Sequence, residues 1–265
     1  MAANYPLRLD IIDSIMSILG VTKTAYWPFV ENEGLTIVGH AGGPVLAASE
    51  TAGAAEALED DFNPMLHPGG VHTYDFHPTG DHHLAGGDDA DYSHGDASAD
   101  SAVSFGALII PNDVGAARAI IAKYDSGGNT EEYKYGIASS GKMELELHDA
   151  SASASEIGTA DTALTRYRPA FVVVTYDGAQ AAPKVLHYKN GALDSAVTGP
   201  TTETGAYVAM EGTAAPLTIG CAGVTATPTE EFHGRMGGPF MCGKELSQAE
   251  ITALWHLYRD LYGLP

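Results

Sequence analysis

The segment Phe232–Arg259, "FHGRMGGPFMCGKELSQAEITALWHLYR", contains an apolar stretch, a glycine break and then a helix with a clear start. Ser247 and Glu250 form a capping box, in which each side chain satisfies a free backbone N–H group of the other residue. Gly263 and Pro265 mark the end of the helix. One face of the helix is apolar and carries Ile251, Leu254, Trp255 and Tyr258. The segment therefore predicts a strand followed by an amphipathic helix that packs on the rest of the chain.

The composition of the 265-residue chain limits its class: it is 45% hydrophobic, with 31 Gly and 14 Pro. This is enough apolar material for one large β domain or two small ones. The formal net charge of −21 repels phosphate backbones, so we expect no nucleic-acid partner. No stretch approaches the roughly 18 apolar residues of a membrane span. Asp10 and Asp13 interrupt the first apolar run, which is atypical of a signal peptide. Cys221 and Cys242 lie in apolar segments and are predicted to be buried thiols.

A second helix is predicted over Leu7–Leu19, where apolar residues recur with helical periodicity. An isolated helix of this length is only marginally stable, so its apolar stripe must pack on its own domain or on another subunit. We therefore divide the chain into an N-terminal helix or docking segment, residues 1–22, and a main domain, residues 23–265. The candidate docking side chains are Ile11, Ile12, Ile15, Ile18 and Leu19.

Between the two helices the sequence predicts short strands separated by turn residues. The Asn190-Gly191 pair is a strong hairpin signal, because it supplies the positive φ angles of a type I′ turn. Many short strands with such turns indicate an antiparallel sandwich or barrel. The predicted strands are Ala102–Ile110, Ala119–Tyr124, Glu132–Ile137, Met143–His148, Ala170–Tyr176, Lys184–Tyr188, Tyr207–Met210, Leu217–Cys221 and Gly238–Cys242.

Five motifs in a fixed order resemble those of the laminin-G-like, concanavalin A-like jelly rolls. They are "AYWPFVENEG" (Ala25–Gly34), "HLAGGDDADYS" (His83–Ser93), "FVVVTYDG" (Phe171–Gly178), "LHYKNGALDSA" (Leu186–Ala196) and the segment from Phe232 to Trp255. The resemblance covers Thr24 to Pro265. It implies an all-β, antiparallel two-sheet jelly-roll sandwich with a short N-terminal helix and a C-terminal helix packed on the sandwich.

The same resemblance bears on calcium, because family members often bind a structural calcium ion through carboxylates. This chain departs from the family at three such places. It has Pro169 before the "Tyr-Asp-Gly" strand where many relatives have Trp, Met236-Gly237-Gly238 where many have an acidic pair, and Gly39-His40 where an Asp is common. We therefore predict no cofactor and leave calcium or another divalent ion open.

Candidate glycan-binding residues lie on two adjacent predicted strands. Tyr133 and Tyr135 share one face of their strand and are either exposed platforms for sugars or core residues. In "MELELHD", Glu144, Glu146 and His148 share one face, about 7 Å from each to the next. Jelly-roll glycanases use two carboxylates on alternate positions of one strand. This segment resembles that pattern only loosely, and a solvated polar strand face is the favoured interpretation.

A His- and Asp-rich segment is a second candidate, because imidazole and carboxylate groups together can bind zinc or another divalent ion. No ligand spacing singles out three or four of them, and loops also favour Asp and His for turn chemistry. A solvated loop is therefore the default. The residues concerned are His67, His72, His77, His82, His83 and His94, with Asp75, Asp81, Asp88, Asp89, Asp91 and Asp96.

The leading hypothesis from the sequence is a non-enzymatic structural or adhesion protein with a lectin-like fold. More specifically, we predict a virion surface component made in the host cytoplasm, such as a phage head decoration or tail-associated protein. Its partners would be other virion proteins or further copies of itself, and cell-surface glycans. The alternative is a soluble carbohydrate-binding lectin module, extracellular or at the cell surface. A glycoside hydrolase that uses Glu144 and Glu146 is less favoured.

Overall fold

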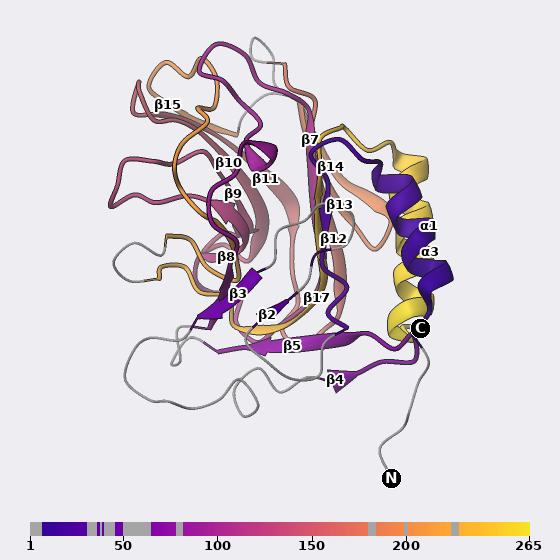
Figure 1. Ribbon diagram of the computed structural model, residues 1–265. Helices are drawn as coiled ribbons and strands as arrows, with labels where there is room; N and C mark the ends of the chain where they lie inside the picture. Colours follow the sequence, from indigo (N-terminus) through magenta and orange to yellow (C-terminus); the bar gives the residue numbers. More distant parts are fainter. Residues whose placement is uncertain are drawn as a thin grey trace.

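The chain folds into two antiparallel β-sheets that face each other as a sandwich, with helices outside one sheet (Figure 1). The computed structural model describes residues 7–30, 36–37, 39, 46–49, 65–77, 82–179, 184–198, 201–223 and 228–265. This architecture confirms the all-β jelly-roll sandwich predicted from the sequence.

The first sheet, sheet A, has the order β14-β13-β12-β7-β17-β5-β4, and β1 pairs with β17. Both faces of its central strands are buried. In β12, Val172 and Val174 face the other sheet, whereas Phe171 and Val173 face the helices. The strand is therefore a continuous apolar run. The bounds are β1 Ala25–Tyr26, β4 Met65–Leu66, β5 His72–Phe76, β7 Val103–Pro111, β12 Ala170–Tyr176, β13 Lys184–Lys189, β14 Ala192–Thr198 and β17 Gly234–Cys242.

The second sheet, sheet B, has the order β15-β11-β10-β9-β8-β16-β6-β3-β2. Its strands alternate, because only one face is in the core: in β10, Leu145 and Leu147 are buried, whereas Glu144 and Glu146 are not fully buried. The bounds are β2 Thr36–Ile37, β3 Leu46–Ser49, β6 His83–Ala85, β8 Arg118–Lys123, β9 Tyr133–Ile137, β10 Lys142–Asp149, β11 Ala154–Ala163, β15 Thr202–Thr204 and β16 Leu217–Ile219.

The helices α1 (Leu9–Leu19) and α3 (Gln248–Tyr262) lie side by side on the outer face of sheet A (Figure 1). The capping box of α3 is present as predicted. Gly263 ends α3 in the left-handed conformation that glycine adopts most easily, with φ of 66°. The ring of Tyr258 lies 4.4 Å from that of Phe171 on β12. Within the described part of the chain, no helix is long and apolar enough to cross a bilayer.

The docking role predicted for the apolar stripe of α1 is wrong, because other parts of the same chain bury this stripe. Ile11, Ile12, Ile15 and Leu19 are at most 4% exposed and form one cluster with α3 and sheet A, against which Ile18 also packs. Burying such a side chain is worth about 1.5–3 kcal/mol. The helix is therefore part of the sandwich's own packing and has no free apolar face of this kind to offer another subunit.

Candidate functional site

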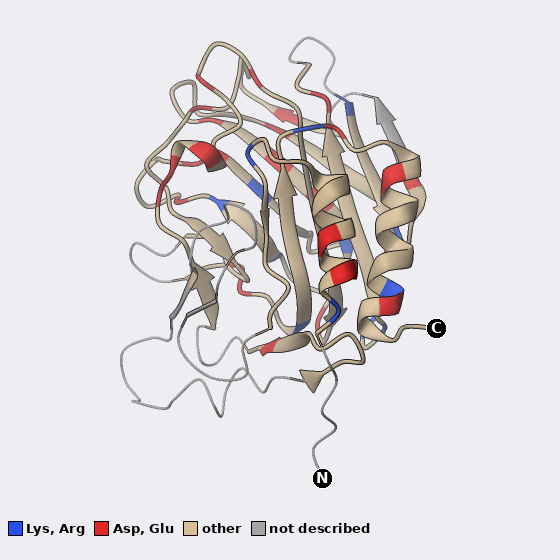
Figure 2. Cartoon of the chain, turned by 45° about the vertical axis from the view of Figure 1, so that its right-hand side comes forward, with Lys and Arg blue, Asp and Glu red and all other residues tan. Residues whose placement is uncertain are grey.

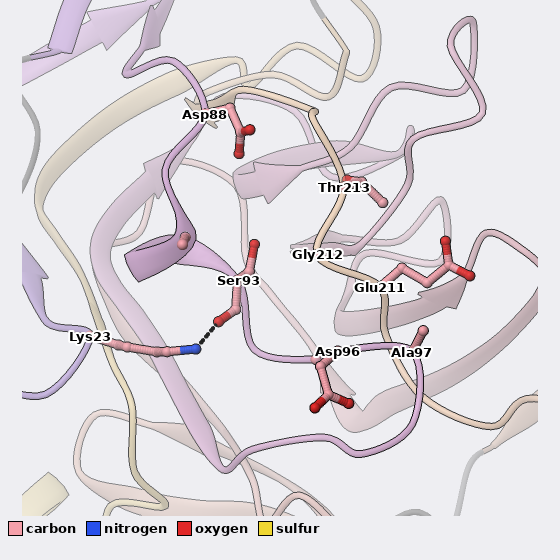
Figure 3. Close-up of a pocket in the computed structure, with 10 residues that line it drawn as sticks. Lys23, Asp88, Ser93, Asp96, Ala97, Glu211, Gly212 and Thr213 are labelled. Atoms are coloured by element: carbon pink, nitrogen blue, oxygen red, sulfur yellow. Dashed lines mark hydrogen bonds between the residues drawn. The ribbon is translucent and has the colours of Figure 1, made fainter.

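A cavity of about 670 Å³ opens at one end of the sandwich, near the start of β7. We call it the end pocket. Three segments that are distant in sequence form it: Lys23, which follows α1; residues 88–97; and residues 211–213 (Figure 3). Lys23 reaches across from its own segment and donates a hydrogen bond to the carbonyl of Ser93.

The first wall of the end pocket is residues 88–97, which a buried carboxylate holds in place. The short 3₁₀ helix η2 (Ala90–Tyr92) starts at Asp89, whose side chain accepts a hydrogen bond from the Asp91 backbone. After η2, the Ser93 hydroxyl and the His94 backbone N–H donate to the two carboxylate oxygens of Glu132, at 3.1 and 2.7 Å. These two hydrogen bonds fix the loop to Glu132, the residue immediately before β9.

A buried lysine connects this wall to the rest of the pocket. The Nζ atom of Lys123 lies 3.3 Å from Glu132 and 3.1 Å from Asp88, and the Lys123 and Glu132 side chains are fully buried. Lys123 also donates to the carbonyl of Thr213 in the opposite wall. Burial raises the pKa of Glu132 to about 6, although the charge of Lys123 opposes the shift. The ammonium group of Lys123 therefore connects the two walls of the end pocket.

The second wall, residues 211–213, is fixed by Asp100. Its Oδ1 atom accepts from the Met210 backbone N–H at 2.8 Å, and its Oδ2 atom accepts from the hydroxyls of Tyr176 and Tyr207 at 2.6 and 2.7 Å. The two walls also touch directly at Gly95, where an added Cβ would lie 2.1 Å from the Met210 carbonyl oxygen. Only glycine permits this approach, so the shape of the pocket is set before any ligand binds.

A smaller cavity of about 220 Å³ adjoins the end pocket and shares Lys23, Gly95 and Asp96 with it. His94 contributes to its lining and is fully buried. Its ring packs against those of Phe105 and Tyr133, and neither ring nitrogen has a hydrogen-bond partner among the described residues. Burial lowers the pKa of His94 to about 3, so the imidazole is neutral at physiological pH.

The polar groups of the end pocket are mainly acidic. Asp88, Asp96 and Glu211 contribute carboxylates, against the single ammonium of Lys23. Carboxylate oxygens accept hydrogen bonds from hydroxyl groups, and backbone groups at Gly95 and Gly212 are also at the surface of the pocket. Acidic positions outnumber basic ones over the whole molecule (Figure 2). The arrangement suits a neutral ligand rich in hydroxyls and disfavours an anionic one.

Tyr133 and Tyr135 are not the exposed platforms that one of the two sequence interpretations required. Both side chains are fully buried between the sheets, where the Tyr133 hydroxyl donates to the Tyr92 carbonyl at 2.9 Å. Their rings pack against Phe105 of β7 at 4.8 and 6.3 Å. The alternation of β9 points both tyrosines into the core, and the glycan-binding role predicted for them is wrong for this reason.

Glu144, Glu146 and His148 do come together, on the outer face of sheet B. Glu146 lies 2.8 Å from the Lys134 ammonium and 3.1 Å from His148 Nε2. Burial and the neighbouring Glu146 raise the pKa of Glu144 to about 7. Burial alone would raise the pKa of Glu146, but its bonds to His148 and Lys134 outweigh burial and lower this pKa to about 2.

The surroundings of this carboxyl pair do not favour a retaining glycosidase. Such a mechanism needs a free carboxylate nucleophile about 5–5.5 Å from the acid, with the sugar between them, whereas the Glu144 carboxylate accepts a hydrogen bond from the Thr159 hydroxyl at 3.1 Å. Glu146 is also already engaged by Lys134 and His148. Glu146 is therefore bonded to Lys134 and His148, and Glu144 to Thr159, which agrees with the polar strand face favoured from the sequence.

The His/Asp segment is dispersed in the structure. His67 hydrogen-bonds to the Tyr262 carbonyl at 3.0 Å, and His72 to the Phe29 carbonyl at 3.1 Å. Asp81 lies outside the described residues. Among the described residues, no group of three or more His, Cys, Asp or Glu side chains could hold a metal ion. Cys221 and Cys242 are buried thiols that form no disulfide, as predicted.

Comparison with known proteins assigns the fold. The family model of the concanavalin A-like lectin/glucanases superfamily (Laminin_G_3) matches residues 84–252, which is more than half of the chain. The chain therefore belongs to this superfamily of lectin-like jelly rolls. A search of the curated proteins finds no match.

Similar solved structures are mainly binding domains. The binding domain of botulinum neurotoxin serotype G has a TM-score of 0.56 at 10% identity, over 90% of this chain and 51% of that one. The binding domain of Paraclostridial Mosquitocidal Protein 1 has 0.57 at 10%, over 91% and 54%. Domain 4 of AbnA, a GH43 extracellular arabinanase of Geobacillus stearothermophilus, in complex with arabinotriose, has 0.52 at 12%, over 87% and 96%. This chain thus spans about half the length of the neurotoxin domain. Identities this low show the fold alone.

The residues of the end pocket were missed by sequence reasoning. The segment from His83 to Asp100 was noted for its turn residues, Asp and His, and it does form one wall. Nothing in the sequence joins it to Glu211 or to Lys23, because only the fold of the sandwich brings these three segments together.

Proposed function

We infer that this chain is a non-enzymatic carbohydrate-binding domain whose saccharide ligand occupies the end pocket. The observation that carries the proposal is a preformed polar cavity of about 670 Å³ at the loop end of a lectin-like sandwich. Ligand sites in proteins typically measure about 300–1,000 Å³, so the cavity suits a short oligosaccharide.

Preorganisation supports the proposal. The walls are bonded to two carboxylates, the buried Glu132 behind one and the partly buried Asp100 behind the other, and Lys123 connects them. A ligand that enters such a site does not have to order the loops, which lowers the entropic cost of binding. The exposed carboxylate of Asp96 and the partly exposed carboxylate of Glu211 then supply acceptors for sugar hydroxyls.

The same geometry supports binding rather than hydrolysis. The two carboxyl groups suited by position to acid–base chemistry, Glu144 and Glu146, are bonded to Thr159, Lys134 and His148 and lie outside the end pocket. The similar binding domains and the arabinotriose-bound domain of AbnA agree with a binding role. We extend that role to this chain, with cell-surface glycans as the expected partners.

The virion-surface role predicted from the sequence stays a prediction. Its motivation included a docking helix, and α1 is packed on the chain's own α3 instead. A contact with other virion proteins or with further copies of the chain would have to use another surface. Glycan binding is compatible with a location on a virion and with one at a cell surface.

A steric plug in the end pocket tests the proposal. At Gly212 a Cβ atom would have no heavy atom closer than 3.7 Å and would lie near Gly95 and Ser93, so Gly212→Leu should fold and obstruct part of the cavity. Gly115 is a matched control, because it is an exposed loop glycine outside the pocket with similar room for a Cβ.

Wild type and both variants should be screened on a glycan array of neutral and acidic saccharides. We expect wild type and Gly115→Leu to bind the same neutral saccharides, and Gly212→Leu to lose at least about tenfold in affinity, or 1.4 kcal/mol. Binding that survives in Gly212→Leu would place the site elsewhere. Absence of binding in wild type would contradict the proposed function itself.

A further inference from the structure

The loop between β11 and β12, residues 164–169, lies at the end of the sandwich opposite the end pocket. Strand β7 runs from the pocket to this loop. It begins just after Ser101, which lines the smaller cavity beside the end pocket. It ends at Pro111, whose carbonyl accepts a hydrogen bond from the Tyr167 backbone N–H at 2.8 Å. Its nine residues span about 27 Å at roughly 3.4 Å per residue. The β11–β12 loop is therefore separate from the pocket.

Tyr167 stands out in this loop for its exposure and its backbone. At 62% exposure it is the one Phe, Tyr or Trp classed as exposed in the described part of the chain. Its φ is 59°, in the left-handed region that costs a bulky residue about 1–2 kcal/mol. Neither feature contributes to the core. A ring held outward in an unfavourable backbone conformation indicates a role at the surface.

Two arginines flank the ring and place positive charge beside it. Arg166 is fixed by a bond from Nε to the Asn112 carbonyl at 2.8 Å, and its guanidinium lies 5.1 Å from the Tyr167 ring centroid. Its Nη2 atom also donates to the Tyr167 hydroxyl at 3.0 Å. Arg168 is exposed and has no ion-pair partner among the described residues. Asp113, which feels the charge of Arg166, is already held by Arg118 at 2.6 Å.

This positive charge is unusual for the molecule. The chain has 34 acidic and 13 basic residues, yet two of the basic ones flank its exposed tyrosine. An aromatic ring offers a face for the C–H surface of a sugar, and a guanidinium binds a carboxylate through paired hydrogen bonds. Together they match a saccharide that carries a carboxylate, a ligand that the acidic end pocket disfavours.

We propose that Arg166, Tyr167 and Arg168 form a second binding site, for acidic saccharides such as uronic or sialic acids. The ring of Tyr167 stacks on the sugar, Arg168 binds its carboxylate, and Arg166 positions the ring. The site uses no residue of the end pocket, so it stands or falls independently of the pocket's neutral ligand.

The test uses trigalacturonate and its neutral methyl ester, titrated calorimetrically into the full chain at low salt, with sialyllactose as a second acidic probe. Tyr167→Gly removes the ring and relieves the positive φ, so the variant should fold at least as well as wild type. Arg168→Gln removes one charge. Arg8→Gln, on an exposed arginine before α1, and Gly212→Leu, in the end pocket, serve as controls.

We expect wild type to bind the acid at least about tenfold more tightly than the ester, and Tyr167→Gly and Arg168→Gln each to weaken the acid by about tenfold or more. Both controls should bind it as wild type does. Equal binding of acid and ester would overturn the proposal. Loss of acid binding in Gly212→Leu would also overturn it, because the acidic ligand would then bind in the end pocket. Failure of both acidic probes to bind wild type would overturn it as well.

Discussion

The two ends of the sandwich use charge in opposite ways. At the end pocket, a buried ammonium, Lys123, joins two carboxylates beneath a concave and acidic surface. At the other end, the β11–β12 loop holds Tyr167 outward between two exposed arginines. In the first region charge supports the structure, and in the second the guanidinium of Arg168 is exposed. The difference teaches that one small sandwich can place opposite charges at its two ends, separated by the length of β7, and the two proposed sites rest on this contrast.

The largest effect is expected from removing the buried charge at the pocket end. In Lys123→Met, Glu132 keeps its buried carboxylate without its ammonium partner, and breaking a buried ion pair in this way costs about 3–5 kcal/mol. Chemical denaturation should show this loss. Arg168→Met at the loop end should change the free energy of unfolding by no more than about 0.5 kcal/mol.

A second substitution distinguishes a lost ion pair from lost packing. In the double variant Lys123→Met with Glu132→Gln, no fully buried charge is left unpaired, since the Asp88 carboxylate is partly exposed to solvent, so part of the stability should return. If the double variant is as unstable as the single one, packing rather than charge dominates beneath the pocket, and the contrast between the two ends would be weaker than we describe.

The next effect concerns the close contact between the pocket walls. Gly95→Ala places a methyl group 2.1 Å from the Met210 carbonyl oxygen, so the walls must separate. Overpacking of this kind costs about 1–3 kcal/mol, and saccharide affinity should fall with it. Gly212→Ala, whose Cβ has 3.7 Å of room, is the matched control and should behave as wild type in both thermal unfolding and binding.

A further effect is a difference in acid sensitivity, which accumulates with each pH unit below 6.5. His94 has a folded-state pKa of about 3, below the ordinary value of 6.5, so only the unfolded chain binds its proton between these values. Stability from this group is therefore present above pH 6.5 and is lost as pH falls, by up to about 1.4 kcal/mol per pH unit. Glu132 opposes this, because its raised pKa favours the folded state at low pH.

His94→Leu removes the contribution of the histidine and leaves that of Glu132. We expect the variant to lose less stability than wild type between pH 6.5 and pH 4, measured by denaturant midpoints across that range. Identical pH profiles would show that His94 is not held neutral by burial. At the loop end, binding of an acidic saccharide should vary little with pH until the saccharide's own carboxylate is protonated.

Much of the fold could be predicted because its signals are local. The run from Ala170 to Tyr176 was predicted with the bounds that β12 has, since it is buried on both faces and reads as continuous apolar sequence. The capping box fixed the start of α3. The strand β11 was missed, because "ASEIGTADTA" is rich in small and polar residues. Tyr207–Met210 was predicted as a strand but forms none, since Asp100 binds this segment instead.

The site was less predictable, because its residues meet only through the fold. Alternation places Tyr133 and Tyr135 on one face, but it does not say whether that face is the core or the surface. The apolar stripe of α1 requires a partner, yet periodicity cannot tell the chain's own α3 from another subunit. The lining of the end pocket comes from segments more than 100 residues apart, such as Ser93 and Glu211, and no local pattern links them.

The most direct test of the central claim is to locate a bound saccharide on the molecule. Backbone amide signals of the full chain should be followed by NMR during titration with a neutral saccharide that the array identifies. We expect the largest shifts at residues 93–97 and 211–213, with residues 164–169 unchanged. Shifts confined to the outer face of sheet B around Glu144 and Glu146, or to the β11–β12 loop, would contradict the assignment of the end pocket as the carbohydrate site.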